Sequence, residues 1–390
     1  MTIKPFEVRW REAAVDKILK KVRDYEFPDH LDGTGWKFGC DADYLREFRD
    51  YWLNDYDAEA AQAELNRFPQ FSTEIDGFTL HFNHIVGESS GKRPLLLSHG
   101  WPISTYEFWQ VIEKLSHPSR FGGKASDAFD LVIPSIPGFG YSQKPKSLFN
   151  QRQTGALFNK LMADVLGYDS YFAQGGDWGE IINTFIAIDH PQRLRALHFT
   201  TFLVTAPGRL DSTEEKNWAA ERDRLEYPLH AYNHLQATKP QSLAWAVAKD
   251  PMAQASWFIE RFHDWADLRH RSFEEVYPKH FLVTNIMTYL MTETFASSVW
   301  YDAASAEAGV RMMQKGRRVE TPTSFALFPQ HYHTWPPRSF AEKLFNVVGW
   351  TPMDHGGHFA AVEAPDLFVN QLRRWANGVR AEMSAALPPF

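Results

Sequence analysis

The fold of this chain is decided by the stretch Tyr171-Phe172-Ala173-Gln174-Gly175-Gly176-Asp177-Trp178-Gly179-Glu180. It predicts a buried strand, a sharp turn with Asp177 at its apex, and a helix that continues to His190-Pro191. The flanking Gly175 and Gly179 allow the strand and the helix to approach closely. Free N–H groups and the helix dipole at the start of such a helix favour a negative group, so the Asp177 carboxylate fits this position.

An Asp at the apex points to nucleophilic chemistry at a saturated carbon. A carboxylate that attacks such a carbon opens a strained ring or displaces a halide, and it leaves an ester on the protein. Water must then hydrolyse the ester, which requires a general base. The chain should therefore also supply a late His, N–H donors for an oxyanion and a donor for the leaving oxygen. From this stretch alone, an ordinary strand–turn–helix with an N-cap Asp remains an alternative.

Composition restricts the remaining classes of function. A length of 390 residues with 44% hydrophobic residues indicates a globular core with additions. The net charge of -7 argues against a nucleic-acid partner. Cys40 is the single cysteine, so no internal disulfide forms. Residues 1–6 do not resemble a signal peptide, and no run of about 18 apolar residues offers a membrane anchor, so we expect a cytoplasmic location.

The rest of the chain divides by its pattern. Strands that alternate with helices predict a mostly parallel sheet, and a run of helices without strands predicts a cap inserted over its C-terminal edge. Helical spacing over residues 281–300 predicts one long helix, and Glu107 is placed to close a capping box on Ser104. The division we expect is an N-terminal meander with a hairpin over 1–90, a core over 91–205 and 321–390, and a helical cap over 206–320.

Several motifs occur in a fixed order along the chain, and each alone is weak to moderate. They are Asp76-Gly77-Phe78-Thr79-Leu80-His81-Phe82, His99-Gly100-Trp101-Pro102, Ile136-Pro137-Gly138-Phe139-Gly140-Tyr141-Ser142, Gln174-Gly175-Gly176-Asp177-Trp178-Gly179, Tyr232-Asn233-His234-Leu235-Gln236-Ala237-Thr238-Lys239-Pro240 and Gly356-Gly357-His358-Phe359-Ala360-Ala361. With these motifs the chain resembles the epoxide hydrolases of the α/β-hydrolase superfamily, on the microsomal-type branch with a long N-terminal meander. The resemblance implies an α/β-hydrolase fold and a soluble, detoxifying enzyme.

The resemblance also implies a role for each site residue. Asp177 would attack a ring carbon, and His358 would activate the water that hydrolyses the ester. The backbone N–H groups of Trp101 and Trp178 would hold the oxyanion. Two cap tyrosines, Tyr232 and Tyr301, would hydrogen-bond the epoxide oxygen; without the resemblance they would be read as packed aromatic residues. Neither a cofactor nor a metal is implied.

One position departs from the family pattern. After the strand over 324–328 the family has Phe-Pro-x-acid, whereas this chain reads Phe328-Pro329-Gln330-His331. The acid would orient the base and stabilise its protonated form, which a neutral His cannot do. Three readings follow: Asp354 reaches His358, His331 orients the base by a neutral hydrogen bond, or the site has drifted from this activity. A zinc site of His331, His333, His355 and His358 would withdraw the base from Asp177.

The sequence therefore predicts hydrolysis of a small apolar epoxide to a vicinal diol, with water as the second substrate. A haloalkane or haloacid dehalogenase uses the same Asp nucleophile and is an alternative. A non-catalytic binding protein is another, because of His331. The identity of the substrate and the oligomeric state stay open, with a homodimer among the options.

Overall fold

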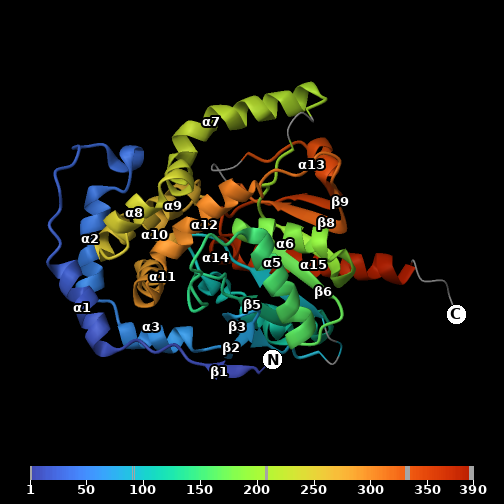
Figure 1. Ribbon diagram of the computed structural model, residues 1–390, viewed down its shortest axis with the longest axis horizontal. Coiled ribbons are helices and arrows are strands. Elements are labelled where there is room, and N and C mark those ends of the chain that lie inside the picture. The colour runs from blue at the N-terminus through green and yellow to red at the C-terminus, as the bar shows by residue number, and fades with distance from the viewer. Residues whose placement is uncertain (1, 90, 92, 207–209, 330–333, 386–390) are drawn as a thin grey trace.

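The computed structural model describes residues 2–89, 91, 93–206, 210–329 and 334–385. Within these residues one sheet has the strand order β1-β2-β3-β5-β4-β6-β7-β8-β9. Neighbouring strands from β5 to β9 run parallel, and β1, β2, β3 and β5 pair antiparallel. Helices cover the sheet, and a group of helices lies at one end of it (Figure 1). This is the predicted α/β-hydrolase architecture with a mostly parallel sheet.

The strands follow the apolar runs of the sequence. β4, β5 and β6 are buried along their whole length, as expected of central strands covered on both faces. The strands are β1 (Lys4–Phe6), β2 (Gln70–Ile75), β3 (Phe78–Ile85), β4 (Pro94–Ser98), β5 (Asp130–Pro134), β6 (Tyr171–Gly175), β7 (Leu194–Phe199), β8 (Val319–Leu327) and β9 (Phe345–Pro352).

The helices fall into three groups, one in the N-terminal meander, one around the sheet and one between β7 and β8. The meander has α1 (Glu12–Arg23), α2 (Ala42–Asn54) and α3 (Ala58–Leu65). Around the sheet lie α4 (Ile112–Ser116), α5 (Gln151–Lys160), α6 (Trp178–Asp189), α13 (Arg338–Leu344), α14 (Ala360–Glu363) and α15 (Pro365–Ala385). The third group has α7 (Thr213–Thr238), α8 (Pro240–Val247), α9 (Pro251–Trp265), α10 (Phe273–Val276), α11 (Lys279–Thr292) and α12 (Phe295–Ala308).

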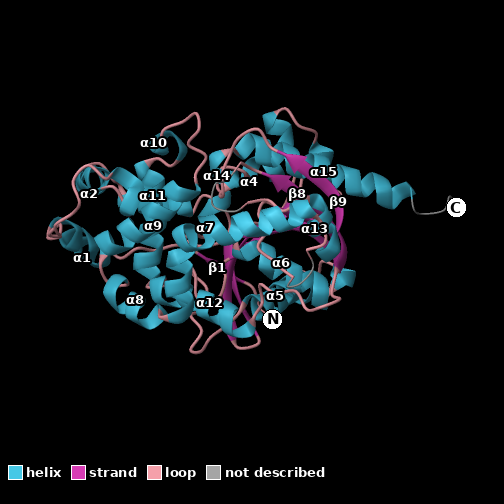
Figure 2. Ribbon diagram, turned by 90° about the horizontal axis from the view of Figure 1, so that it is seen from above, coloured by secondary structure: helices cyan, strands magenta, loops and turns pink. Residues whose placement is uncertain are grey.

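The third group forms the cap, and the meander supports it. In Figures 1 and 2, α1 and α2 lie beside the cap helices α9 and α11, and these pairs are in contact. The two connections between cap and core meet where the Thr205 N–H donates to Arg311 O and the Met313 N–H donates to Thr205 O, both at 2.8 Å. The division into 1–90, 91–205 with 321–390, and 206–320 remains our proposal. No helix in the described part of the chain is both long and apolar enough to cross a membrane.

Two local predictions were wrong. Residues 281–300 do not form one helix, because Glu293 takes a left-handed conformation (φ 56°) that ends α11 before α12 begins. The Ser104–Glu107 capping box does not form either. Ser104 accepts a hydrogen bond from the Tyr106 N–H at the start of a short 3-10 turn, and the Glu107 side chain is buried beneath the loop that carries Gly100. Helix-capping rules do not take burial into account, and here burial of the side chain determines where Glu107 lies.

Candidate active site

Asp177 lies at the junction of β6 and α6, where the sequence predicts a sharp turn between a strand and a helix. Its backbone has φ 48° and ψ -128°, a conformation that L residues rarely adopt. The junction is tight because a Cβ atom at Gly179 would overlap the carbonyl oxygen of Ser98 on β4. The Asp177 N–H donates to Thr201 Oγ1 at 3.1 Å, which holds the strained residue to the segment that follows β7.

Two groups meet the Asp177 carboxylate from different parts of the chain. The Trp101 N–H donates to Oδ1 at 2.9 Å, and His358 Nε2 lies 3.3 Å from Oδ2. Gly100 makes the first contact possible, because a Cβ there would lie 2.6 Å from Oδ1. One carboxylate oxygen therefore faces an oxyanion donor, and the other faces a base.

The loop that carries His358 is braced by two buried carboxylates. The Gly356 N–H donates to Asp267 Oδ2 at 3.0 Å, and the Phe359 N–H donates to Glu363 Oε1 at 3.2 Å. The Asp267 N–H in turn donates to Glu363 Oε2 at 2.9 Å. His358 itself donates its N–H to Trp265 O at 3.0 Å, and its side chain is fully buried. The imidazole is thus held in place from both sides along the chain.

The ring of Tyr232 on α7 packs against Trp101, one of the two tryptophans predicted to donate to the oxyanion. Its ring is parallel to the Trp101 ring at a centroid distance of 5.5 Å, with an angle of 4° between the planes. It also contacts Trp265, whose ring contacts the His358 ring at 4.7 Å. The Trp101 Nε1–H donates to Ser298 Oγ of α12, so the cap is joined to the core at this point.

The ring of Tyr301 on α12 contacts Trp178, the other predicted oxyanion donor. Its ring stands edge-on to the Trp178 ring at 5.4 Å, and its hydroxyl lies 2.7 Å from Thr154 Oγ1. Burial raises the pKa of Tyr301 well above its ordinary value, so the phenol stays protonated at neutral pH.

The next residue, Asp302, joins the two tyrosine-bearing helices. It accepts hydrogen bonds from the side chains of Asn233 and Gln236 on α7, and Arg311 lies 3.8 Å away. Burial raises the pKa of Asp302 to about 7, while Arg311 and the two amides act in the opposite sense. The spacing of Tyr232 and Tyr301 is therefore fixed by a buried polar link between α7 and α12.

Comparisons with known proteins show which proteins this chain is similar to. The family model described as "Epoxide hydrolase N terminus" matches residues 3–108, and the one described as "alpha/beta hydrolase fold" matches residues 93–236. Epoxide hydrolase 1 of Sus scrofa is 30% identical over 96% of this chain and 88% of its own. A Stigmatella aurantiaca protein to which epoxide hydrolase activity is ascribed is 33% identical over 97% of this chain and 86% of its own.

A solved structure extends the agreement to three dimensions. The juvenile hormone epoxide hydrolase of the silkworm Bombyx mori superposes with a TM-score of 0.88 and 26% identity, over 98% of this chain and 96% of that one. The chain belongs to the epoxide hydrolase family of the α/β-hydrolases. Its relatives are epoxide hydrolases, which favours this function over the dehalogenase and the non-catalytic binding protein that the sequence left open.

The structure of this epoxide hydrolase brings together the predicted site residues Asp177, His358, Trp101, Trp178, Tyr232 and Tyr301 through the contacts above. Trp178 begins α6, and the Arg311 guanidinium lies 4.7 Å from its ring. A hydrogen bond from the Trp178 N–H to an oxyanion stays a prediction. The sequence did not reveal Glu363 and Asp267, although each stands between two apolar residues, which is a signal of a buried role.

The sequence analysis proposes His331 and Asp354 as residues that could orient His358 in place of the family's acid. His331 lies outside the described residues, as does His333 of the zinc alternative. Asp354 is exposed, and its backbone carbonyl accepts a hydrogen bond from Arg269. Within the described residues, no group of three or more metal-ligating side chains is close enough to hold an ion.

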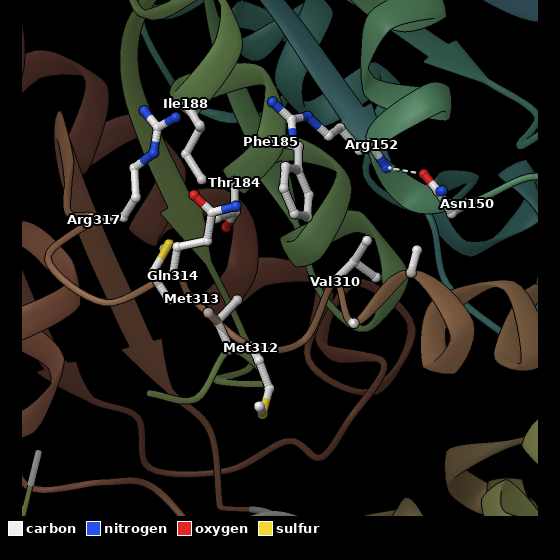
Figure 3. A pocket seen from close by; sticks show the side chains of 13 residues that line it. Asn150, Arg152, Thr184, Phe185, Ile188, Val310, Met312, Met313, Gln314 and Arg317 are labelled. Atoms are coloured by element: carbon white, nitrogen blue, oxygen red, sulfur yellow. Dashed lines mark hydrogen bonds between the residues drawn. The ribbon is translucent and has the colours of Figure 1, made fainter. Parts of the chain in front are cut away.

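A hollow of about 350 Å³ lies on the flank of α6, separate from this site. Thr184, Phe185 and Ile188 of α6 line it together with Met312 and Met313 of the segment that returns from the cap (Figure 3). None of the six predicted catalytic residues contributes to its lining. The hollow therefore has no place in the mechanism proposed below.

Proposed function

We propose that this enzyme hydrolyses a small apolar epoxide to a vicinal diol through a covalent ester on Asp177. One observation carries the proposal: the Asp177 carboxylate lies between the Trp101 N–H at 2.9 Å and His358 Nε2 at 3.3 Å. A nucleophile, an oxyanion donor and a base are the three groups that ester formation and ester hydrolysis require. The family supplies the reaction class, and this geometry supports the assignment of roles.

In the first step, an oxygen of Asp177 attacks one carbon of the epoxide ring. The new ester C–O bond forms, and the ring C–O bond breaks with its electron pair on the epoxide oxygen. Tyr232 or Tyr301 gives its proton to this oxygen, which leaves a hydroxyl on the substrate and a tyrosinate. Tyr232 and Tyr301 belong to the cap helices α7 and α12, and their rings contact Trp101 and Trp178 respectively, which supports a role for them on the cap side of the epoxide.

In the second step, His358 takes a proton from water, and the hydroxide attacks the ester carbonyl carbon. The carbonyl oxygen becomes an oxyanion, which accepts hydrogen bonds from the N–H groups of Trp101 and Trp178. The tetrahedral species collapses, the diol oxygen leaves and takes the proton from His358, and a carboxylic acid remains. Its proton returns to the tyrosinate, so Asp177 is again a carboxylate and one water has been consumed.

Side chains, backbone N–H groups and water supply every group in these steps, so we propose neither a cofactor nor a metal. The proposed substrate class is supported by the buried aromatic side chains of Trp101, Trp178, Trp265, Tyr232 and Tyr301 around the site, because apolar and aromatic surroundings suit an apolar ligand. The cytoplasmic location and the oligomeric state stay predictions.

Two variants test the roles of nucleophile and base. Asp177→Asn should lose turnover, because an amide oxygen is a poor nucleophile. His358→Gln should still form the ester, so intact-protein mass spectrometry should show an adduct that peptide mapping places on Asp177. The assay should follow diol, with halide release from a haloalkane as the comparison. Full activity of Asp177→Asn, or normal diol yield and no adduct in His358→Gln, would contradict the proposed mechanism.

A further inference from the structure

We propose that Glu363 provides the negative charge that stabilises protonated His358 during ester hydrolysis. The inference rests on the proposed function, and it concerns the group that His331 replaces in the family pattern. Glu363 ends α14, four residues after Phe359, and it is 2% exposed.

The need for such a charge arises from the reaction itself. In the resting enzyme, the Asp177 carboxylate lies 3.3 Å from His358 Nε2, so an anion faces the imidazole. Once Asp177 is an ester it is neutral, so His358 loses this anion in the step in which it must accept a proton from water. A second carboxylate has to provide the stabilisation at that stage.

The position of Glu363 matches this need. Its carboxylate accepts the Phe359 N–H at 3.2 Å, directly after His358. Directly before His358, a Cβ atom at Gly357 would lie 2.6 and 2.7 Å from the two Glu363 oxygens. The carboxylate therefore lies against the backbone on both sides of the base, and only a glycine at 357 leaves room for it.

Among the described residues, hydrogen-bond donors contact the Glu363 carboxylate, and no ion pair joins it to a Lys or Arg. The Tyr277 hydroxyl donates to Oε1 at 2.7 Å, and the Asp267 N–H donates to Oε2 at 2.9 Å. Arg271 bonds to the backbone carbonyl of Glu363 and not to its carboxylate. Asp267, the other brace of the loop, is instead paired with Arg269 at 2.7 and 2.8 Å. Of the two buried carboxylates, Glu363 is the one whose charge is left to act on His358.

The protonation of the two groups is coupled in the required sense. Burial raises the pKa of Glu363, and its donors and a positive charge on His358 lower it. Uptake of a proton by His358 therefore favours the ionised form of Glu363, and the ionised form favours that uptake. Among the described residues, the titratable or charged groups that face the pair include Asp177 in the resting enzyme, Tyr277, Arg271 and the Asp267–Arg269 pair. Glu107 also acts on Tyr277, and burial raises the pKa of Glu107 well above its ordinary value.

Single-turnover kinetics of Glu363→Gln test the proposal, because they separate ester formation from ester hydrolysis. The amide keeps the size of the side chain and removes its charge. Ester formation should change by no more than about threefold, whereas hydrolysis at neutral pH should slow by about tenfold or more. When the hydrolysis rate is plotted against pH, it falls on the acid side as the base becomes protonated, and we call this fall the acid limb. In Glu363→Gln the acid limb should move to lower pH by about one unit, because His358 becomes a weaker base.

Two further variants separate charge from structure. Asp267→Asn weakens the support of the same loop but removes a charge that Arg269 already neutralises, so it should leave the acid limb in place. His331→Glu restores an acid to the family position. In the Glu363→Gln background it should move the acid limb back toward the wild-type pH, which the loss of a purely structural contact would not allow.

The outcomes are distinct. Overlapping hydrolysis profiles of wild type and Glu363→Gln, or no recovery with His331→Glu, would overturn the role of Glu363. Absence of any ester on Asp177 in all variants would instead overturn the proposed function. Should Glu363→Gln fail to fold, Tyr277→Phe provides the test, since it removes one donor from the carboxylate and should shift the acid limb in the same direction by a smaller amount. An unshifted limb in Tyr277→Phe would then contradict the proposal.

Discussion

At the scale of single residues, the site depends on space around Asp177 as much as on its charge. Its backbone conformation costs on the order of 1–3 kcal/mol, which the surrounding contacts must offset. The Trp101 N–H and Thr201 Oγ1 hold the side chain and the backbone of Asp177 respectively. Gly100 is the residue that allows the Trp101 loop to come this close. Catalysis should therefore be sensitive to one added methyl group at position 100.

We predict that Gly100→Ala lowers kcat by about 100-fold, because a displacement of about 1 Å at a reacting group has an effect of this size. The added Cβ would lie 2.6 Å from Asp177 Oδ1, so either the carboxylate or the loop must move. Steady-state diol formation measures the loss, and circular dichroism shows that the fold is retained.

Gly378→Ala is the matched control for this substitution. Gly378 lies in α15, and a Cβ there would meet nothing within 4 Å. It should leave kcat unchanged and stabilise the helix by about 0.5–1 kcal/mol. Equal kcat values for the two variants would mean that the space beside Asp177 is not limiting.

Residue types and spacing predict some of the candidate site residues and not others. Asp177, Trp101 and His358 stand in glycine-bounded motifs whose geometry is local, so the sequence is enough to propose them. Glu363 acts on His358 through a close approach of α14 to the loop before it, and only the fold shows that approach. A lone carboxylate within an apolar run is the signal that sequence reasoning should have used.

At the scale of elements, α6 is joined to the start of the cap connection by a buried carboxylate. Glu180, one turn after Asp177, accepts a hydrogen bond from the Thr201 hydroxyl at 2.6 Å and from the Leu203 N–H at 2.8 and 2.9 Å. Thr201 can accept from the Asp177 N–H because its own proton is given to Glu180. The strained nucleophile and the segment that leads to the cap therefore share one anchor.

We predict that Glu180→Gln destabilises the protein by about 1–3 kcal/mol and also lowers kcat, because the amide NH₂ places a donor where the partners are donors. Urea unfolding and steady-state kinetics at one pH measure the two effects together. Thr201→Ser should retain activity, since it keeps the hydroxyl between Glu180 and Asp177.

Glu215→Gln is the control for the loss of a buried carboxylate elsewhere. Glu215 closes the capping box of α7 and binds Ser339 and Lys343 of α13. It should cost stability to a similar degree and leave kcat unchanged. An equal loss of kcat in both variants would show that general loosening, rather than the link from Glu180 to Asp177, accounts for the effect.

Elements were predictable where burial and local pattern agree. β4, β5 and β6 are wholly apolar runs, and their type and position follow from the sequence. The break at Glu293 was not predictable, because a left-handed residue between two apolar helical segments leaves no trace in the hydrophobic pattern. α7 runs to Thr238, and its later part is held by hydrogen bonds to Asp302 of α12, which a local pattern does not reveal.

At the scale of the whole molecule, the alternation of strands and helices predicts the sheet but not how the outer parts meet. The contacts of α1 and α2 with α9 and α11 join segments that lie far apart in the sequence, and no local pattern encodes them. The same folding also buries the side chains of His81, His99 and His198. Burial lowers the pKa of His81 to about 3, of His99 to about 4 and of His198 to about 3.

These histidines should make the fold acid-sensitive. An unfolded His titrates near pH 6.5, so below that pH the unfolded chain binds protons that the folded chain does not. The contribution of each neutral, buried His to stability is present above pH 6.5 and is lost as the pH falls toward its folded pKa. Each should contribute a loss of about 2 kcal/mol between pH 7 and pH 5.

His198→Leu isolates one of these contributions. His198 lies on β7 against Trp375, and neither of its ring nitrogens has a hydrogen-bond partner among the described residues. Leu is similar in volume and removes both the unsatisfied polar atoms and the titration, so stability at pH 7 should be equal to or above that of the wild type. Urea unfolding, followed by tryptophan fluorescence at pH 7 and pH 5, should show a loss smaller by about 2 kcal/mol in the variant. The same loss in both proteins would mean that His198 takes up its proton without unfolding, and that the buried histidines do not set the acid limit of the fold.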